Sequence, residues 1–157
     1  MVRLELFKQE DFSALNYALD ENQQQYTSTV EQALNRISER NDSKAFSVTV
    51  FEDDEPAGFF VLDFGDDKFE LTDNTQSALL RSLSINPVLQ GRGIGKEAMQ
   101  IVDEFVKKTF PDCDEIVLAV NQKNLSAYHL YLKTGYAYDG KSRMGRSGPQ
   151  YLMYKKL

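Results

Sequence analysis

The chain has 157 residues and a formal net charge of -6, and 41% of its residues are hydrophobic. This length suits one domain, residues 1–157, with a single core. The negative charge argues against nucleic acid as a partner, because phosphates require a basic surface. No apolar run is long enough to cross a bilayer, and the N-terminus lacks the apolar core of a signal peptide. We therefore expect a cytoplasmic protein without a nucleic-acid or membrane partner.

Cysteine chemistry is not expected to contribute. The only cysteine, Cys113, cannot form an internal disulfide and lies between Asp112 and Asp114. Acidic neighbours raise the pKa of a thiol and oppose a nucleophilic role.

Hydrophobic periodicity predicts three elements in the first part of the chain. Alternating apolar side chains indicate a strand over residues 2–7. Apolar residues at helical spacing predict a first helix over residues 12–19. Ser28 and Glu31 form a capping-box pattern that begins a second amphipathic helix, continuing to Ile37.

An antiparallel hairpin follows these helices. Residues 46–50 and 59–62 are rich in aromatic and β-branched side chains, and residues 52–58 form the turn between them. Residues 65–77 are polar, and their sequence does not decide between an extension of the hairpin and a mobile loop over a substrate site.

The next elements alternate between strand and helix. Residues 79–85 predict a strand, and the apolar face from Ile94 to Phe105 predicts a helix that Pro111 ends. Residues 116–120 are apolar on both faces, as in a strand covered on both sides.

The C-terminal part is predicted to contain one helix and two strands. Asn124 is a candidate N-cap and Gly135 a candidate stop for a short helix. Strands are expected over residues 135–139 and 150–155. The loop between them, residues 140–149, is expected to hold three basic side chains in solvent: Lys141, Arg143 and Arg146.

A glycine-rich turn, Gln-Gly-Arg-Gly-Ile-Gly-Lys at residues 90–96, connects the strand 79–85 to the next helix. A strand, turn and helix in this order gather backbone N–H groups at the positive end of the helix, which suits a pyrophosphate. The turn is not a P-loop, because three residues instead of four separate Gly91 from Gly95 and Glu97 stands in place of Ser or Thr. It is not a dinucleotide fingerprint, because Lys96 occupies the place of the third glycine.

Two motifs together give a family resemblance. The pattern Gln-x-x-Gly-x-Gly runs from Gln90 through Gly93 to Gly95, and residues 124–136 follow it with Asn-x-x-Ala-x-x-x-Tyr-x-x-x-Gly-Tyr. Either motif alone has a plain alternative, a glycine-rich connection or a core tyrosine. In this order and on these elements they resemble the GCN5-related N-acetyltransferase (GNAT) family, over about the C-terminal half of the chain. The resemblance implies an α/β fold with a mixed, mostly antiparallel sheet and helices on both faces.

The resemblance also implies acetyl-CoA as co-substrate and an N-acetyltransferase that moves the acetyl group to a primary amine by direct attack, without a metal. The strand residues before the turn would pair with the pantetheine, the turn would bind the pyrophosphate, and the asparagine of the second motif would contact the cofactor or cap its helix. The residues implied in cofactor binding are Leu83, Ser84, Ile85, Gln90, Gly91, Arg92, Gly93, Ile94, Gly95, Lys96 and Asn124.

The resemblance gives Tyr131 the role of general acid. A phenol with an ordinary pKa of about 10 stays protonated at neutral pH until a thiolate takes the proton. The general base is less defined: Glu70 and Asp73 precede the motif strand and are the candidates, with a water relay as the alternative. The only histidine, His129, is expected to be a surface or packing residue.

The acceptor is not specified by any motif. Acidic clusters at residues 53–55 and 63–73 favour a small cationic amine, because an acidic surface concentrates cations. Three other possibilities stay open: an acyl-CoA-binding sensor or interaction module without amine turnover, a nucleotide-binding protein that uses the same turn, and assembly as a homodimer.

Overall fold

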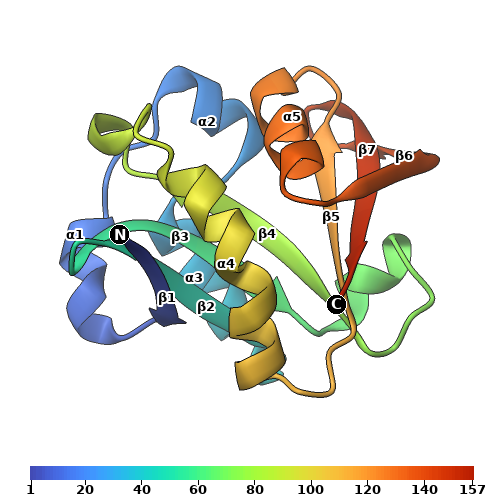
Figure 1. Ribbon diagram of the computed structural model, residues 1–157, viewed down its shortest axis with the longest axis horizontal. Helices are drawn as coiled ribbons and strands as arrows, with labels where there is room; N and C mark the ends of the chain where they lie inside the picture. The colour runs from blue at the N-terminus through green and yellow to red at the C-terminus, as the bar shows by residue number, and fades with distance from the viewer.

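The computed structural model describes all residues from 1 to 157, and its strands form one seven-stranded sheet in the order β1-β2-β3-β4-β5-β7-β6 (Figure 1). Neighbouring strands are antiparallel except β4 and β5, which are parallel. The mixed, mostly antiparallel sheet predicted from the sequence is therefore confirmed. The strands are β1 (Val2–Leu6), β2 (Ala45–Glu52), β3 (Glu55–Asp63), β4 (Ser77–Ile85), β5 (Glu115–Asn121), β6 (Ala137–Gly145) and β7 (Gly148–Lys156).

Helices cover both faces of the sheet. The main core lies on the face of α4 and α5, and a smaller core lies on the face of α1 and α3; in Figure 1, α4 crosses in front of the sheet and α3 lies behind it. No helix is long and apolar enough to span a membrane. The helices are α1 (Phe12–Leu15), α2 (Glu21–Tyr26), α3 (Val30–Arg40), α4 (Ile94–Thr109) and α5 (Leu125–Lys133).

The parallel strands β4 and β5 separate soon after they begin. Only residues 77–79 of β4 pair with residues 115–117 of β5, and the two strands then diverge toward α2 (Figure 1). A bulge bends β4 at the point of separation: Val61 of β3 pairs with Arg81 and Phe59 pairs with Ser84, and Ser82 between them has a φ of 60°. A positive φ is uncommon for a residue other than glycine and is often found where a strand must turn away from its neighbour.

The region between β1 and α3 differs from the prediction. The helix expected over residues 12–19 ends at Leu15, and a separate helix, α2, follows. The side chain of Asp20 caps α2 by accepting a hydrogen bond from the Gln23 N–H at 2.8 Å. The capping box of α3 is formed one position later than predicted, by Thr29 and Gln32, because the side chain of Ser28 is bound by Arg36.

Two turns differ from the prediction, and the structure decides a third segment that the sequence left open. The turn between β2 and β3 contains only Asp53 and Asp54, whose positive φ values of 49° and 70° allow a tight reversal. Residues 65–76, whose structure the sequence left undecided, contain a 3₁₀ turn, Asp66–Glu70, and do not extend the β2–β3 hairpin; β4 begins at Ser77. The expected loop over residues 140–149 belongs almost entirely to the β6–β7 hairpin, whose turn is at Arg146 and Ser147.

Candidate active site

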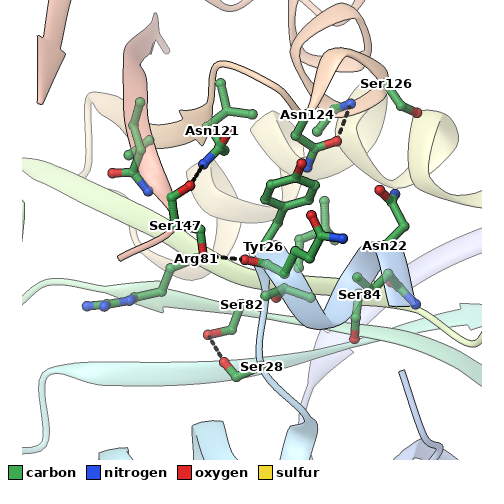
Figure 2. Close-up of a pocket in the computed structure, with 18 of the residues that line it drawn as sticks. Asn22, Tyr26, Ser28, Arg81, Ser82, Ser84, Asn121, Asn124, Ser126 and Ser147 are labelled. Carbon is green, nitrogen blue, oxygen red and sulfur yellow. Dashed lines mark hydrogen bonds between the residues drawn. The ribbon is translucent and has the colours of Figure 1, made fainter. Parts of the chain in front are cut away.

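A cleft of about 610 Å³ occupies the gap between β4 and β5 (Figure 2). Its lining includes Gly91 just before α4 and Gly95 in the first turn of α4 on one face of the sheet, and Ser28 and Arg36 on the other face. The cleft therefore passes through the sheet. Figure 2 shows Tyr26 projecting from the end of α2 into the cleft, with Arg81, Ser82 and Ser28 on the side of α3.

The N-terminus of α4 has the properties of an anion site. Gly91 and Gly93 have φ values of 82° and 79°, and a Cβ atom at either position would meet no other atom within 4 Å. The N-cap Gly93 contributes no side-chain hydrogen bond. The first N–H groups of a helix have no partner within it, so they are free to bind a ligand. The backbone and the space in front of it fit the pyrophosphate of acetyl-CoA.

The side chains of this turn are placed differently from one another. Gln90, Gly91 and Gly95 line the cleft, whereas Arg92 and Lys96 are exposed beside it. Ile94 is buried in the core, so only its backbone N–H is available to a cofactor. These placements suit a site in which backbone N–H groups make the main contacts with the cofactor and the charged side chains of Arg92 and Lys96 add to them from outside.

The open edge of β4 is covered by α2. Leu83, Ser84 and Ile85 line the cleft, and the side-chain amide of Gln23 accepts from the Ile85 N–H and donates to the Ile85 carbonyl, both at 3.3 Å. The Tyr17 and Ser84 hydroxyls are hydrogen-bonded at 2.7 Å. Burial raises the pKa of Tyr17 to about 12, so this pair is neutral at physiological pH.

Tyr131 lies in the wall of the cleft on α5. Its side chain is 7% exposed, and its ring packs edge-on against Tyr136 with centroids 5.5 Å apart. Burial raises its pKa well above the ordinary value, because the phenolate would be poorly hydrated. Asn124, which also lines the cleft, caps α5 by accepting from the Ala127 N–H at 3.4 Å.

The two carboxylates predicted as candidate bases lie outside the cleft lining. No Asp, Glu or His is among the residues that form the cleft wall. Glu70 is exposed and pairs with Arg143, and Asp73 is exposed. This placement argues against direct contact between either carboxylate and a bound amine. His129 is exposed on α5, as expected.

The acidic clusters also lie outside the cleft lining, and several of their members form ion pairs. Asp53 binds the N-terminal ammonium group at 2.8 Å, and Asp54 pairs with Arg3. Asp63, whose side chain is buried, binds Arg40 at 2.6 Å. Burial opposes ionisation of Asp63, but the Arg40 hydrogen bonds and the Gly65 N–H outweigh it and lower the pKa of this carboxyl.

Sequence reasoning missed two groups of cleft residues. One is the polar helix α2, for which Asp20 as an N-cap was the only local signal. The other is a set of arginines from α3, β4 and the β6–β7 hairpin. These are distant in sequence, so no local pattern could have brought them together. The arginines in the cleft lining are Arg36, Arg81, Arg143 and Arg146.

The comparison with known families agrees with this geometry. The model of the Acetyltransferase (GNAT) family matches residues 8–136. The chain belongs to the GNAT family. It is therefore a CoA-dependent N-acetyltransferase with acetyl-CoA as co-substrate. A relative named as the uncharacterized N-acetyltransferase YbbJ of Bacillus subtilis (strain 168) is 34% identical over 158 residues, covering 99% of this GNAT chain and 98% of that protein.

Solved structures of other GNAT enzymes share the fold. AAC(6')-Ib in complex with acetyl-CoA superposes with a TM-score of 0.80 at 19% identity, over 99% of this chain and 93% of that one. A spermidine N-acetyltransferase from Vibrio cholerae, in complex with CoA and spermine, superposes with a TM-score of 0.71 at 20% identity, over 99% and 95% of the two chains. At these identities the similarity establishes the GNAT fold and leaves the acceptor open.

Proposed function

We propose that this protein transfers the acetyl group of acetyl-CoA to a primary amine by direct attack, without a covalent enzyme intermediate. The observation that supports this most directly is the cleft between β4 and β5, which has the uncapped N-terminus of α4 at one end and Tyr131 in its wall. A cleft through the sheet lets the two substrates meet at the thioester from opposite faces.

The chain's own residues would hold acetyl-CoA along β4. The N–H groups at the start of α4 bind the pyrophosphate, and Gly91 and Gly93 leave room for it. The backbone of Leu83 and Ile85 pairs with the pantetheine in the manner of an added strand. The Ile85 N–H is bonded to the Gln23 amide and the Ile85 carbonyl to the amides of both Gln23 and Gln90, so these side chains have to turn away when the pantetheine binds.

Transfer requires two proton movements. The amine nitrogen attacks the thioester carbonyl carbon, the carbon–sulfur bond breaks, and the sulfur leaves with the bonding electrons. Tyr131 donates its phenolic proton to the sulfur and recovers one from solvent. Because the cleft wall contains no carboxylate, and Glu70 and Asp73 are not among its residues, we assign removal of the amine proton to water in the cleft.

The nature of the acceptor amine is a separate question. The acidic residues that favoured a cationic amine are not among the cleft lining, and several of them lie in ion pairs, so they do not support a cationic acceptor at this cleft. The enzymes of similar fold are named for aminoglycosides and spermidine, but at 18% and 20% identity their substrates do not carry over.

Two measurements test the proposed function. The first is calorimetric titration with acetyl-CoA, and the second is CoA release, measured with a thiol reagent, across a panel of primary amines. Binding together with amine-dependent CoA release and an acetylated product supports the transferase. Binding without any acetylated product would instead favour an acyl-CoA-binding module, and absence of binding would refute the assignment of residues 90–96.

A further inference from the structure

The lining of the cleft contains basic side chains and no acidic ones. Its lining includes four arginines and no acidic residue, although the whole protein has a net charge of -6. We call this set, Arg36, Arg81, Arg143 and Arg146, the arginine cluster. A positive site inside an acidic protein is not explained by the overall composition, which indicates a local function.

Two members of the cluster have no carboxylate partner. Arg81 binds Asp67 at 2.8 Å and Asp63 at 3.3 Å, and Arg143 pairs with Glu70. In contrast, Arg36 donates only to the hydroxyl groups of Ser28 and Ser82, and Arg146 makes no ion pair or side-chain hydrogen bond. The two charges are therefore available to a ligand.

The free arginines are close enough to affect each other. Burial is the main reason that the pKa of Arg36 is lowered, and the charges of Arg81 and Arg146 lower it further. Like charges in one site repel each other until a counter-ion arrives. The arrangement is thus destabilised when empty and stabilised by an anion.

The cofactor's phosphates are not the anion in question. Arg36 belongs to α3, which packs on the small core formed with Phe59 and Val61, and Arg81 is bound to Asp63 on this same face. The pyrophosphate site at the start of α4 lies on the opposite face of the sheet. An anion bound by Arg36 and Arg146 has to come from the second substrate.

We propose that the acceptor is an amine whose molecule also carries a carboxylate or phosphate group, and that Arg36 and Arg146 bind this group. The proposal rests on the transferase function proposed above. Guanidinium groups bind both anions through paired N–H donors. A free anion in the acceptor raises the pKa of its ammonium group. Neutralising that anion lowers this pKa, which helps the amine to lose its proton in a cleft without a carboxylate base.

The test uses amines in matched pairs. Glutamate is compared with its diamide and glycine with its amide for the carboxylate, and phosphoethanolamine is compared with ethanolamine for the phosphate; putrescine and spermidine represent cationic amines. We expect kcat/KM for the members with an additional anion to exceed that of their partners without the anion by at least about tenfold, and the better of the two groups names the anion. A preference for the polyamines, or for the amide and ethanolamine partners, would overturn the proposal.

Variants of the free arginines test their role. Arg146→Gln, at the exposed hairpin turn, and Arg36→Gln should each raise KM for the anionic amine about tenfold or more without changing the Kd for acetyl-CoA. Lys141→Gln, an exposed basic residue of β6 outside the cleft lining, is the control and should change neither. An unchanged KM in both arginine variants would show that the cluster does not bind the acceptor.

A binding experiment separates this inference from the proposed function. Saturation-transfer NMR with glutamate and with phosphoethanolamine, in the presence of CoA, detects the anion site without turnover. Binding that Arg146→Gln abolishes supports the site even if no acetyl group is transferred. Transfer to other amines without binding of either probe would leave the transferase intact and refute the anionic acceptor.

Discussion

Tyr131 is held as a neutral phenol by its surroundings. Its side chain is buried against Tyr136, and burial raises its pKa well above the ordinary value. Such a group does not ionise spontaneously at neutral pH, but it can protonate a thiolate that forms beside it. The residue is thus suited to donating a proton and unsuited to acting as the base.

Replacing Tyr131 with phenylalanine tests this role. Tyr131→Phe should lower kcat by about 100-fold under conditions where chemistry limits the rate, because the leaving sulfur loses its proton donor. The Kd for acetyl-CoA, measured by calorimetry, should stay within about twofold of the wild-type value. Tyr128→Phe is the control, since Tyr128 is on the same helix but outside the cleft lining. Unchanged kcat in single-turnover experiments would exclude the acid role.

Gly93 combines a positive φ with open space in front of it, and a matched glycine exists elsewhere in the chain. Gly93→Ala should weaken acetyl-CoA binding about tenfold or more, because the new methyl group occupies space where the pyrophosphate approaches. Gly140 on β6 also has a positive φ, 99°, and no atom near its Cβ position. Gly140→Ala should therefore lose similar stability, about 1 kcal/mol, without affecting calorimetric binding. Equal binding by the two variants would contradict the assigned site.

At the scale of elements, α2 covers the strand edge that acetyl-CoA would use. Gln23 forms two hydrogen bonds with the backbone of Ile85. Gln23→Ala should tighten acetyl-CoA binding about three- to tenfold in calorimetry, because these bonds, worth about 1 kcal/mol each, no longer have to be broken.

A neighbouring glutamine on α2 provides the control. The side chain of Gln24 donates to the Leu19 carbonyl at 2.9 Å and does not line the cleft. Gln24→Ala loosens the start of α2 without freeing Ile85. If it tightened binding as much as Gln23→Ala, the effect would come from mobility of the helix and not from competition for the strand edge.

The periodic elements could be predicted from the sequence, and the non-periodic ones could not. In β1, α3 and α4 each element buries one face against a core, so its apolar residues recur with the period of a strand or a helix and can be recognised from the sequence. The helix α2 buries none of its residues, so no stripe marks it. The outer part of β6 is mostly exposed on an edge and likewise lacks an apolar alternation.

The same distinction applies to the site. The residues 90–96 and the α5 motif are local patterns, so sequence alone singled out Gly91, Gly95, Asn124 and Tyr131, all of which line the cleft. Arg36 of α3 and Arg146 of the β6–β7 hairpin are far apart in the sequence. They line the same cleft only because the fold places both elements beside the gap between β4 and β5. Their juxtaposition is a property of the tertiary structure, and composition pointed to the opposite charge.

At the scale of the whole molecule, three tyrosines make the free energy of unfolding depend on pH in the alkaline range. Burial raises the pKa of Tyr17 to about 12, and those of Tyr131 and Tyr136 are raised well above their ordinary value. An unfolded tyrosine ionises near pH 10, so the folded state holds more protons above that pH. These three groups should not change the free energy of unfolding below about pH 10, and they should lower it as the pH rises further.

Tyr17→Phe measures one part of this dependence. At pH 8 the variant loses its hydrogen bond to Ser84 and should be less stable than the wild type. At pH 11 the difference in the free energy of unfolding, measured in urea, should shrink by about 1 kcal/mol, because only the wild type still has the Tyr17 phenol to titrate. A difference that is the same at both pH values would mean that Tyr17 titrates as it does in the unfolded chain.

The sheet is held together at its centre by few contacts. The strands β4 and β5 pair through three residues each, whereas β5 and β7 pair through seven. The hydroxyl of Ser147 donates to the Gln25 carbonyl at 2.8 Å and connects the two sides again beyond the cleft. Along the strands, the cleft is therefore closed at one end by the β4–β5 pairing and at the other by this hydrogen bond. It is open on the two faces of the sheet and is not a groove on one surface.

An opening through the sheet has two entrances. In the proposed function, acetyl-CoA enters from the side of α4 and the acceptor from the side of α3, so neither substrate has to pass the other. We therefore expect that CoA can leave while an acceptor is bound, and that the two substrates can bind in either order.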